Sequence, residues 1–327
     1  MHARRCVNAG ARLLVSPGML PRALAATLAA VACLQPAVAA ADPAKAWAAA
    51  RAGLPASTEV LVGVDLTQLT RTSSFKMLLP VLLAKQPELR DGLALVKATC
   101  GFDPLAAIEA VVIGADKDQA AGALYVAVKG LDEARIATCM EGVANAQSAA
   151  AATIAITREG GITQLAVGAD RLFLRWIGKD VIAVPLTFTD RAQLQAWTGG
   201  KKALARGKVG PFLRKLDTRA AVWGVSTRPE EFDGAKATSG YGALSTRGGA
   251  LAPELHIVLA SAADATAMAT KATTELAAKA AAPDLAASLK AVLSTVSVIA
   301  IGAEVVIKAR IVEKELLGLV GALLRGM

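Results

Sequence analysis

Histidine is the first residue to consider, because it supplies most general bases and many metal ligands in proteins. The chain contains two histidines, His2 and His256. His2 lies in an N-terminal segment that we expect to be removed, whereas His256 lies inside the apolar run Leu255–Leu259, which is typical of a packed strand. The sequence therefore predicts no Ser-His-Asp triad and no histidine-based metal site.

A serine motif also matches a catalytic pattern. The run Ser73-Ser74-Phe75-Lys76 fits the S-x-x-K motif of penicillin-binding enzymes. The other elements of that active site, including Lys-Thr-Gly, have no counterpart in the chain, so a helix start followed by a solvated lysine explains these residues. We accordingly predict no catalytic residue, no metal site and no cofactor.

Six basic residues follow one another without an intervening acid between positions 201 and 215. They are Lys201, Lys202, Arg206, Lys208, Arg214 and Lys215. Such a run either binds phosphate-bearing partners in the cell envelope or forms a solvated connection between two parts of the fold. Both alternatives stay open, and the six residues are the candidate anion-binding site.

The cysteines indicate an oxidising compartment. Two of the four, Cys6 and Cys33, lie in the N-terminal segment, which leaves Cys100 and Cys139 as a pair. Two cysteines in an exported chain usually form a disulfide. We predict a Cys100–Cys139 bridge, with two separate buried thiols as the alternative.

The first 41 residues have the three parts of a secretory signal peptide. Arg22 precedes the uncharged Ala- and Leu-rich run Ala23–Cys33, and Ala37-Val38-Ala39 supplies a small-x-small cleavage site. Cleavage is expected at Ala39, Ala40 or Ala41, with translation starting at Met1 or Met19. As an alternative, Cys33 carries a lipid that anchors the protein.

The mature chain that remains has about 287 residues, enough for one large domain or two ordinary ones. The 36 basic residues include four arginines of the leader, and none of the 27 acidic residues lies there, so the mature net charge is 32 − 27 = +5. This charge is too small to indicate a nucleic-acid-binding protein. The longest uncharged stretch near the C-terminus, 291–303, is too short to span a bilayer.

Apolar runs and turn residues predict an α+β fold. Strands are expected at 59–66, 110–114 and 123–128, a first helix beginning at Phe75, a second helix at 88–99, and an antiparallel meander over 153–186. The Gly- and Lys-rich segment 199–217 separates a first unit, 42–198, from a second, 218–327. In the second unit a Gly-rich loop over 229–249 replaces the helices of the first, and a helix over 313–324 closes the chain.

These two units have the same order of strands and helices, which indicates a degenerate internal duplication. Together they predict a mostly antiparallel sheet with helices on one face.

Two short motifs resemble a known group of sequences. Leu54-Pro55-Ala56-Ser57-Thr58-Glu59-Val60 and Phe102-Asp103-Pro104-Leu105 are similar to segments of a family of uncharacterised exported bacterial proteins. The resemblance extends over most of the mature chain and implies export and fold, since the family has no assigned activity.

From the sequence we expect a periplasmic or secreted envelope protein that binds or scaffolds a partner without catalysis. The partner is an anionic envelope component or another envelope protein, and neither nucleic acid nor a transmembrane segment is expected. The first alternative is a carrier of a small apolar ligand such as a lipid. A hydrolase that works without histidine ranks last.

Overall fold

The computed structural model describes residues 44–147, 154–167, 170–232, 235–283, 285–316 and 318. The segment expected to be a leader, with Cys33 and the expected cleavage region at Ala39, Ala40 and Ala41, lies outside the described residues. The expected closing helix also lies largely outside them.

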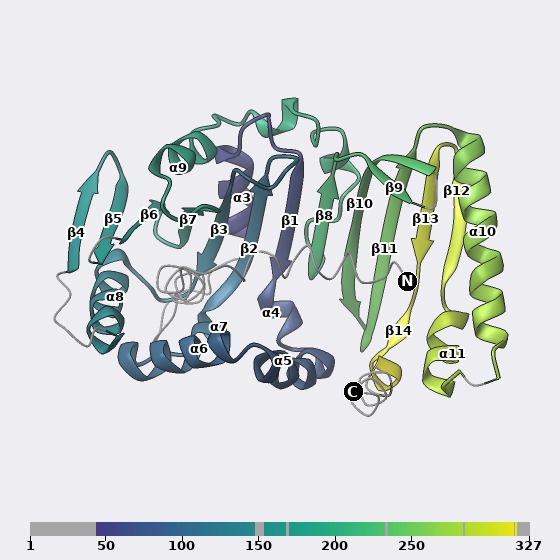
Figure 1. Ribbon diagram of the computed structural model, residues 1–327, viewed down its shortest axis with the longest axis horizontal. Helices are drawn as coiled ribbons and strands as arrows, with labels where there is room; N and C mark the ends of the chain where they lie inside the picture. The colour runs from purple at the N-terminus through teal and green to yellow at the C-terminus, as the bar shows by residue number, and fades with distance from the viewer. Residues whose placement is uncertain are drawn as a thin grey trace.

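One antiparallel sheet runs along the whole length of the molecule (Figure 1). Its 14 strands follow the order β12-β13-β11-β10-β8-β1-β2-β3-β7-β6-β5-β4, with β14 beside β11 and β9 beside β10. In the first half the strands are β1 (Val60–Asp65), β2 (Ile108–Ala115), β3 (Gly122–Val128), β4 (Ile154–Glu159), β5 (Ile162–Val167), β6 (Asp170–Ile177) and β7 (Val181–Pro185). In the second half they are β8 (Val222–Ser226), β9 (Glu230–Phe232), β10 (Ala235–Arg247), β11 (Ala250–Leu259), β12 (Ser297–Ile301), β13 (Glu304–Lys308) and β14 (Ile311–Val312).

The described helices lie before, between and after these strands. The α-helices are α3 (Ala44–Gly53), α4 (Leu66–Leu69), α5 (Ser73–Lys85), α6 (Pro87–Cys100), α7 (Pro104–Ala107), α8 (Glu133–Gln147), α9 (Arg191–Thr198), α10 (Ala262–Ala281) and α11 (Ala287–Ser294). Two 3₁₀ turns, η1 (Leu204–Arg206) and η2 (Phe212–Arg214), lie between α9 and β8. Among the described helices, none combines the length and the apolar character that crossing a bilayer requires.

The α+β class and the antiparallel sheet are confirmed, but the helices of the first half cover both faces of the sheet. Leu124 and Val126 of β3 belong to a core that includes residues of α6 and α8. Tyr125 and Ala127 belong to a second core on the opposite face, with residues of α3 and α9. All seven residues of β3 are apolar and buried, so neither face of this strand can be left in water.

The strand order supports the internal duplication. Strands β1 and β8 pair at the centre of the sheet, with Val62 opposite Gly224. On one side of this pair the order is β1-β2-β3-β7-β6, and on the other it is β8-β10-β11-β13-β12. The third strand of each series is followed by a helix, α8 after β3 and α10 after β11. These two helices pack on the same face of the sheet, because the strand registers place the core under α10, which includes Ala237 and Leu259, on the same side as the core under α8. The strand order is therefore the same on each side of the β1–β8 pair, as a duplication would produce.

The loop expected over 229–249 is instead mostly strand. It contains β9 and the 13-residue β10, which pairs with β8 on one side and β11 on the other. Its glycines suggested a loop, yet its residues alternate in burial, with Ala237, Ser239 and Tyr241 facing inward. In a paired central strand, glycine is tolerated where another backbone approaches closely.

The predicted disulfide is confirmed. Cys100 at the end of α6 and Cys139 in α8 are joined, with their Cα atoms 4.9 Å apart. Cys139 is buried in the core under α6 and α8, and Cys100 packs against that core. The bridge therefore fastens the two helices that cover one face of the first half.

Candidate functional site

The basic segment 199–217 does not cross open solvent as a linker would. Leu204, Val209 and Leu216 are buried in the same core as α3 and the inner residues of β1. A Cβ atom on Gly207 would lie 2.1 Å from the backbone oxygen of Ala56, so the segment approaches the chain before β1 as closely as glycine allows. These contacts fix the path of the segment, while its basic side chains stay exposed.

The six predicted basic residues divide into three groups. Lys201 and Lys202 form a turn with positive φ angles next to the end of α3, where the Lys202 N–H donates to the oxygen of Ala52 at 2.9 Å. Positive charges at this position interact favourably with the negative, C-terminal end of the helix dipole. These two lysines are therefore placed to stabilise α3.

Lys208 and Lys215 form ion pairs within the fold. The Lys208 Nζ lies 2.8 Å from Glu59 Oε1, and the Lys215 Nζ lies 2.6 Å from Glu304 Oε1. Each lysine therefore has a carboxylate partner at hydrogen-bond distance. This leaves Arg206 and Arg214 as the candidates for binding an external anion.

Arg206 and Arg214 line one cleft together with Arg51 of α3. The cleft has a volume of about 540 Å³, and its wall also includes Trp47 and Leu213. No aspartate or glutamate lines it among the described residues. We call it the arginine cleft and define it by Arg51, Arg206, Arg214 and Trp47.

The position of each group in the arginine cleft follows from local packing. Arg51 lies in the last turn of α3, whose opposite side buries Ala46 and Ala50. Trp47 packs its ring edge-to-face on Trp223 of β8, with ring centroids 4.9 Å apart. Leu204 of η1 is fully buried, which directs Arg206 of the same turn outward.

Guanidinium groups suit phosphate oxygens because they stay charged and donate several hydrogen bonds in one plane. Three of them beside a tryptophan offer charge and an aromatic wall to one ligand. Arg51 was missed in the sequence, because it is about 150 positions away from the basic run. The one available signal was its place in the last turn of an amphipathic helix.

His256 lies in a network of charged side chains on β10, β11 and β13. Its ring stacks on Tyr241, with centroids 4.4 Å apart and an interplanar angle of 11°. Its Nε2 lies 2.9 Å from Glu254 Oε1, and its Nδ1 lies 3.3 Å from Glu304 Oε2. The Lys308 Nζ is 3.0 Å from Glu254 Oε1. Among the described residues, no serine or cysteine side chain bonds to His256, and its two ring nitrogens lie beside the carboxylates of Glu254 and Glu304.

Two ionised carboxylates hold this network together. Burial alone would raise the pKa of Glu304, but hydrogen bonds from Lys215, Tyr241 and His256 outweigh it and lower that pKa. Burial and the negative charge of Glu304 raise the pKa of Tyr241, whose phenol donates to Glu304 Oε2 at 2.9 Å. Because Lys215 follows Arg214, the network also fixes η2 beside the arginine cleft.

We expect a measurable pH dependence from Glu304. Its pKa is lowered by folding from an ordinary value of 4.5, so it stabilises the fold above that value and loses this contribution as pH falls below it. As pH is lowered from 6 to well below 4.5, the melting temperature of the parent should therefore fall further than that of Glu304→Gln. Parallel curves for the two proteins in differential scanning calorimetry would contradict this role.

In the described part of the chain, no group of three or more His, Cys, Asp or Glu side chains is placed to hold an ion. Ser73, the serine of the S-x-x-K match, is the first residue of α5, and the N–H of the adjacent Ser74 donates to Glu313 Oε1 at 2.9 Å. Its environment is therefore a helix start with a capping carboxylate.

Comparisons with known proteins add little. No protein-family model and no curated protein matches the chain. The solved structure "Structure of crystal form I of TP0453" is similar, with a TM-score of 0.45, 11% identity, and coverage of 87% of this chain and 98% of that one. For "Structure of crystal form III of TP0453" the TM-score is 0.43 at 11% identity, covering 84% and 97%. At these values the likeness carries no argument about activity, and the resemblance to exported bacterial proteins stays a prediction.

Proposed function

We propose that this chain is an exported, non-catalytic binding protein of the bacterial envelope whose arginine cleft holds a phosphate-bearing anion. The observation that carries the proposal is that three guanidinium groups line one cleft without a carboxylate among the described residues. An anion that leaves water for this cleft exchanges its hydration for charge-assisted hydrogen bonds, which are stronger than neutral ones.

The phosphate group could belong to a free anion or to a lipid headgroup, and two probes separate these sources. Isothermal titration calorimetry with inorganic pyrophosphate measures binding of the free anion. Sedimentation with phosphatidylglycerol vesicles measures binding to headgroups. Either interaction should weaken as salt is raised, because the Debye length shrinks from about 30 Å at 0.01 M to about 8 Å at 0.15 M. Absence of binding to both probes at low salt would refute the proposal.

Export is the second part of the proposed function and rests on the leader sequence. Expressed in full in a Gram-negative host, the protein recovered from the periplasm should begin between Ala40 and Asp42. Amino-terminal sequencing checks this directly. A protein that keeps Met1 or Met19 would contradict cleavage, and a blocked, lipid-bearing Cys33 would favour the anchored alternative.

A second candidate function, the carriage of a small apolar ligand, is favoured by a groove beside α10. The groove has a volume of about 390 Å³, and Ile257, Met268, Val305 and Ile307 form much of its apolar wall. Leu255 lies opposite Ile307 in the sheet register and is 43% exposed. Native mass spectrometry of protein purified from the periplasm would reveal a bound lipid as a discrete added mass, and an empty protein would count against a carrier.

A further inference from the structure

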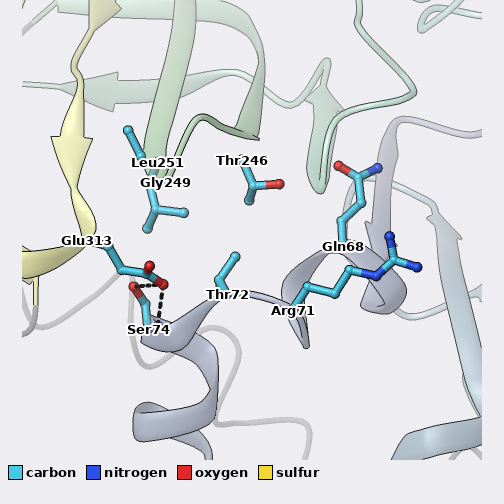
Figure 2. Close-up of a pocket in the computed structure, with 9 residues that line it drawn as sticks. Gln68, Arg71, Thr72, Ser74, Thr246, Gly249, Leu251 and Glu313 are labelled. Atoms are coloured by element: carbon cyan, nitrogen blue, oxygen red, sulfur yellow. Dashed lines mark hydrogen bonds between the residues drawn. The ribbon is translucent and has the colours of Figure 1, made fainter.

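A second pocket, separate from the arginine cleft, lies where the two halves of the chain meet. It is at the opposite end of the sheet strands from the arginine cleft. It is bounded by α4 and the start of α5 from the first half, and by the β10–β11 turn and the residue after β14 from the second (Figure 2). Its volume of about 300 Å³ is at the small end of the range for ligand pockets. It therefore suits a molecule of a few heavy atoms up to a dipeptide.

Two ionised groups of opposite charge line this pocket without meeting each other. Glu313 and Arg71 stand on opposite sides of it (Figure 2). No ion pair joins them, and Arg71 forms none with any other described residue. A cavity with one charge at each side favours a ligand that carries the complementary charges at its own two ends.

The negative side of the pocket is fixed by α5. Glu313 Oε1 accepts the N–H of Ser74 at 2.9 Å, and this bond lowers the pKa of Glu313 below its ordinary value. Since Glu313 already occupies the N-terminal end of α5, that helix end is not the group that would hold a ligand. The carboxylate itself faces the pocket and would attract an ammonium group.

Polar and apolar groups between the two charges complete the lining. The Gln68 Nε2 donates to Asp65 Oδ2 at 2.7 Å and to the oxygen of Arg219 at 2.9 Å, so its side-chain carbonyl is held as an acceptor. Thr246 presents its hydroxyl at the pocket, and Leu251 provides an apolar wall (Figure 2). These groups match a ligand that resembles the backbone of an amino acid and carries a small side chain.

We propose that this pocket binds a small zwitterion whose primary ammonium contacts Glu313 and whose anionic group contacts Arg71. An ammonium with a carboxylate belongs to an amino acid or a short peptide, and an ammonium with a phosphate belongs to an ethanolamine headgroup. A simple anion is disfavoured, because it would also face the Glu313 carboxylate. The site is independent of the arginine cleft and takes a different class of ligand.

The test is isothermal titration calorimetry of the mature chain with four probes. Alanyl-alanine and phosphoethanolamine carry both charges, whereas acetate and methylammonium carry one each. We expect at least one zwitterion to bind at least tenfold more tightly than either singly charged probe. The zwitterion that binds identifies the source, and equal or absent binding of all four overturns the proposal.

Two variants and a control decide whether the binding occurs at this pocket. Arg71→Gln and Glu313→Gln should each weaken the zwitterion at least tenfold, because each removes one of the two charges. Arg90→Gln removes an exposed arginine of α6 outside the pocket and should bind like the parent. Since Glu313→Gln could also loosen α5, its melting temperature is measured alongside, and Arg71→Gln alone is decisive. Unchanged affinity in Arg71→Gln would overturn the assignment.

Discussion

Replacing both Cys100 and Cys139 with alanine should lower the free energy of unfolding by about 2–4 kcal/mol. The bridge spans 39 residues of sequence, so its loss returns the conformational freedom of a long loop to the unfolded chain. It also leaves a gap at the side chain of Cys139, which is buried under α6 and α8. Both effects act on the same helix pair and have the same sign.

Urea denaturation of the parent and the double variant, followed by circular dichroism, measures this difference. Thiol labelling of the denatured, unreduced parent should find no free sulfhydryl in the mature chain. Two labels per chain, or equal denaturation midpoints for the two proteins, would contradict a stabilising bridge.

Gly63→Ala should be one of the most damaging single-methyl additions in the chain. A Cβ atom at Gly63 would lie 2.1 Å from the ring of Trp223, which occupies the space above this glycine on the neighbouring strand. Neither strand can retreat, because Gly63 also pairs with Val112 of β2 on its other side. We expect a loss of about 3 kcal/mol, at the upper end of the usual cost of overpacking.

A double-mutant cycle tests the cause. Trp223→Ala alone should cost about 3–5 kcal/mol, because it empties a buried aromatic site. The pair Gly63→Ala/Trp223→Ala should cost less than the sum of the two, by about 2 kcal/mol, since the clash is then absent. Strict additivity would show that Gly63 is required for another reason. Because Trp47 packs on Trp223, the Gly63→Ala variant should also weaken anion binding at the arginine cleft.

Local sequence signals were sufficient for much of the fold. The meander over β4–β7 was predicted because its segments alternate with period two and its connections contain glycines. In the structure, Gly160 and Gly178 of these connections have positive φ angles. The disulfide followed from an even cysteine count in a chain that was expected to be exported. The repeat was visible in the order of elements, although the pairing of β1 with β8 is a long-range contact that no local pattern specifies.

Other features depended on tertiary packing. The all-apolar β3 carried a signal for helices on both faces, but β10 contains Gly240 and Gly242 and therefore has the composition of a loop. The candidate site was half predictable. Arg206 and Arg214 belong to a visible basic run, whereas Arg51 joins them only because α3 packs against η1.

The measurement that tests the arginine cleft most directly compares two triple variants of equal charge. Arg51→Gln/Arg206→Gln/Arg214→Gln removes the three guanidinium groups of the cleft, and Lys76→Gln/Arg90→Gln/Lys117→Gln removes three exposed charges elsewhere. If each cleft charge contributes about 1 kcal/mol toward an anionic partner, their loss weakens binding about a hundredfold. Calorimetry at low salt, with whichever phosphate probe the parent binds, should show this loss in the cleft variant and near-parent affinity in the control. Equal weakening in both variants would mean that net charge alone attracts the anion, and would contradict a site at the arginine cleft.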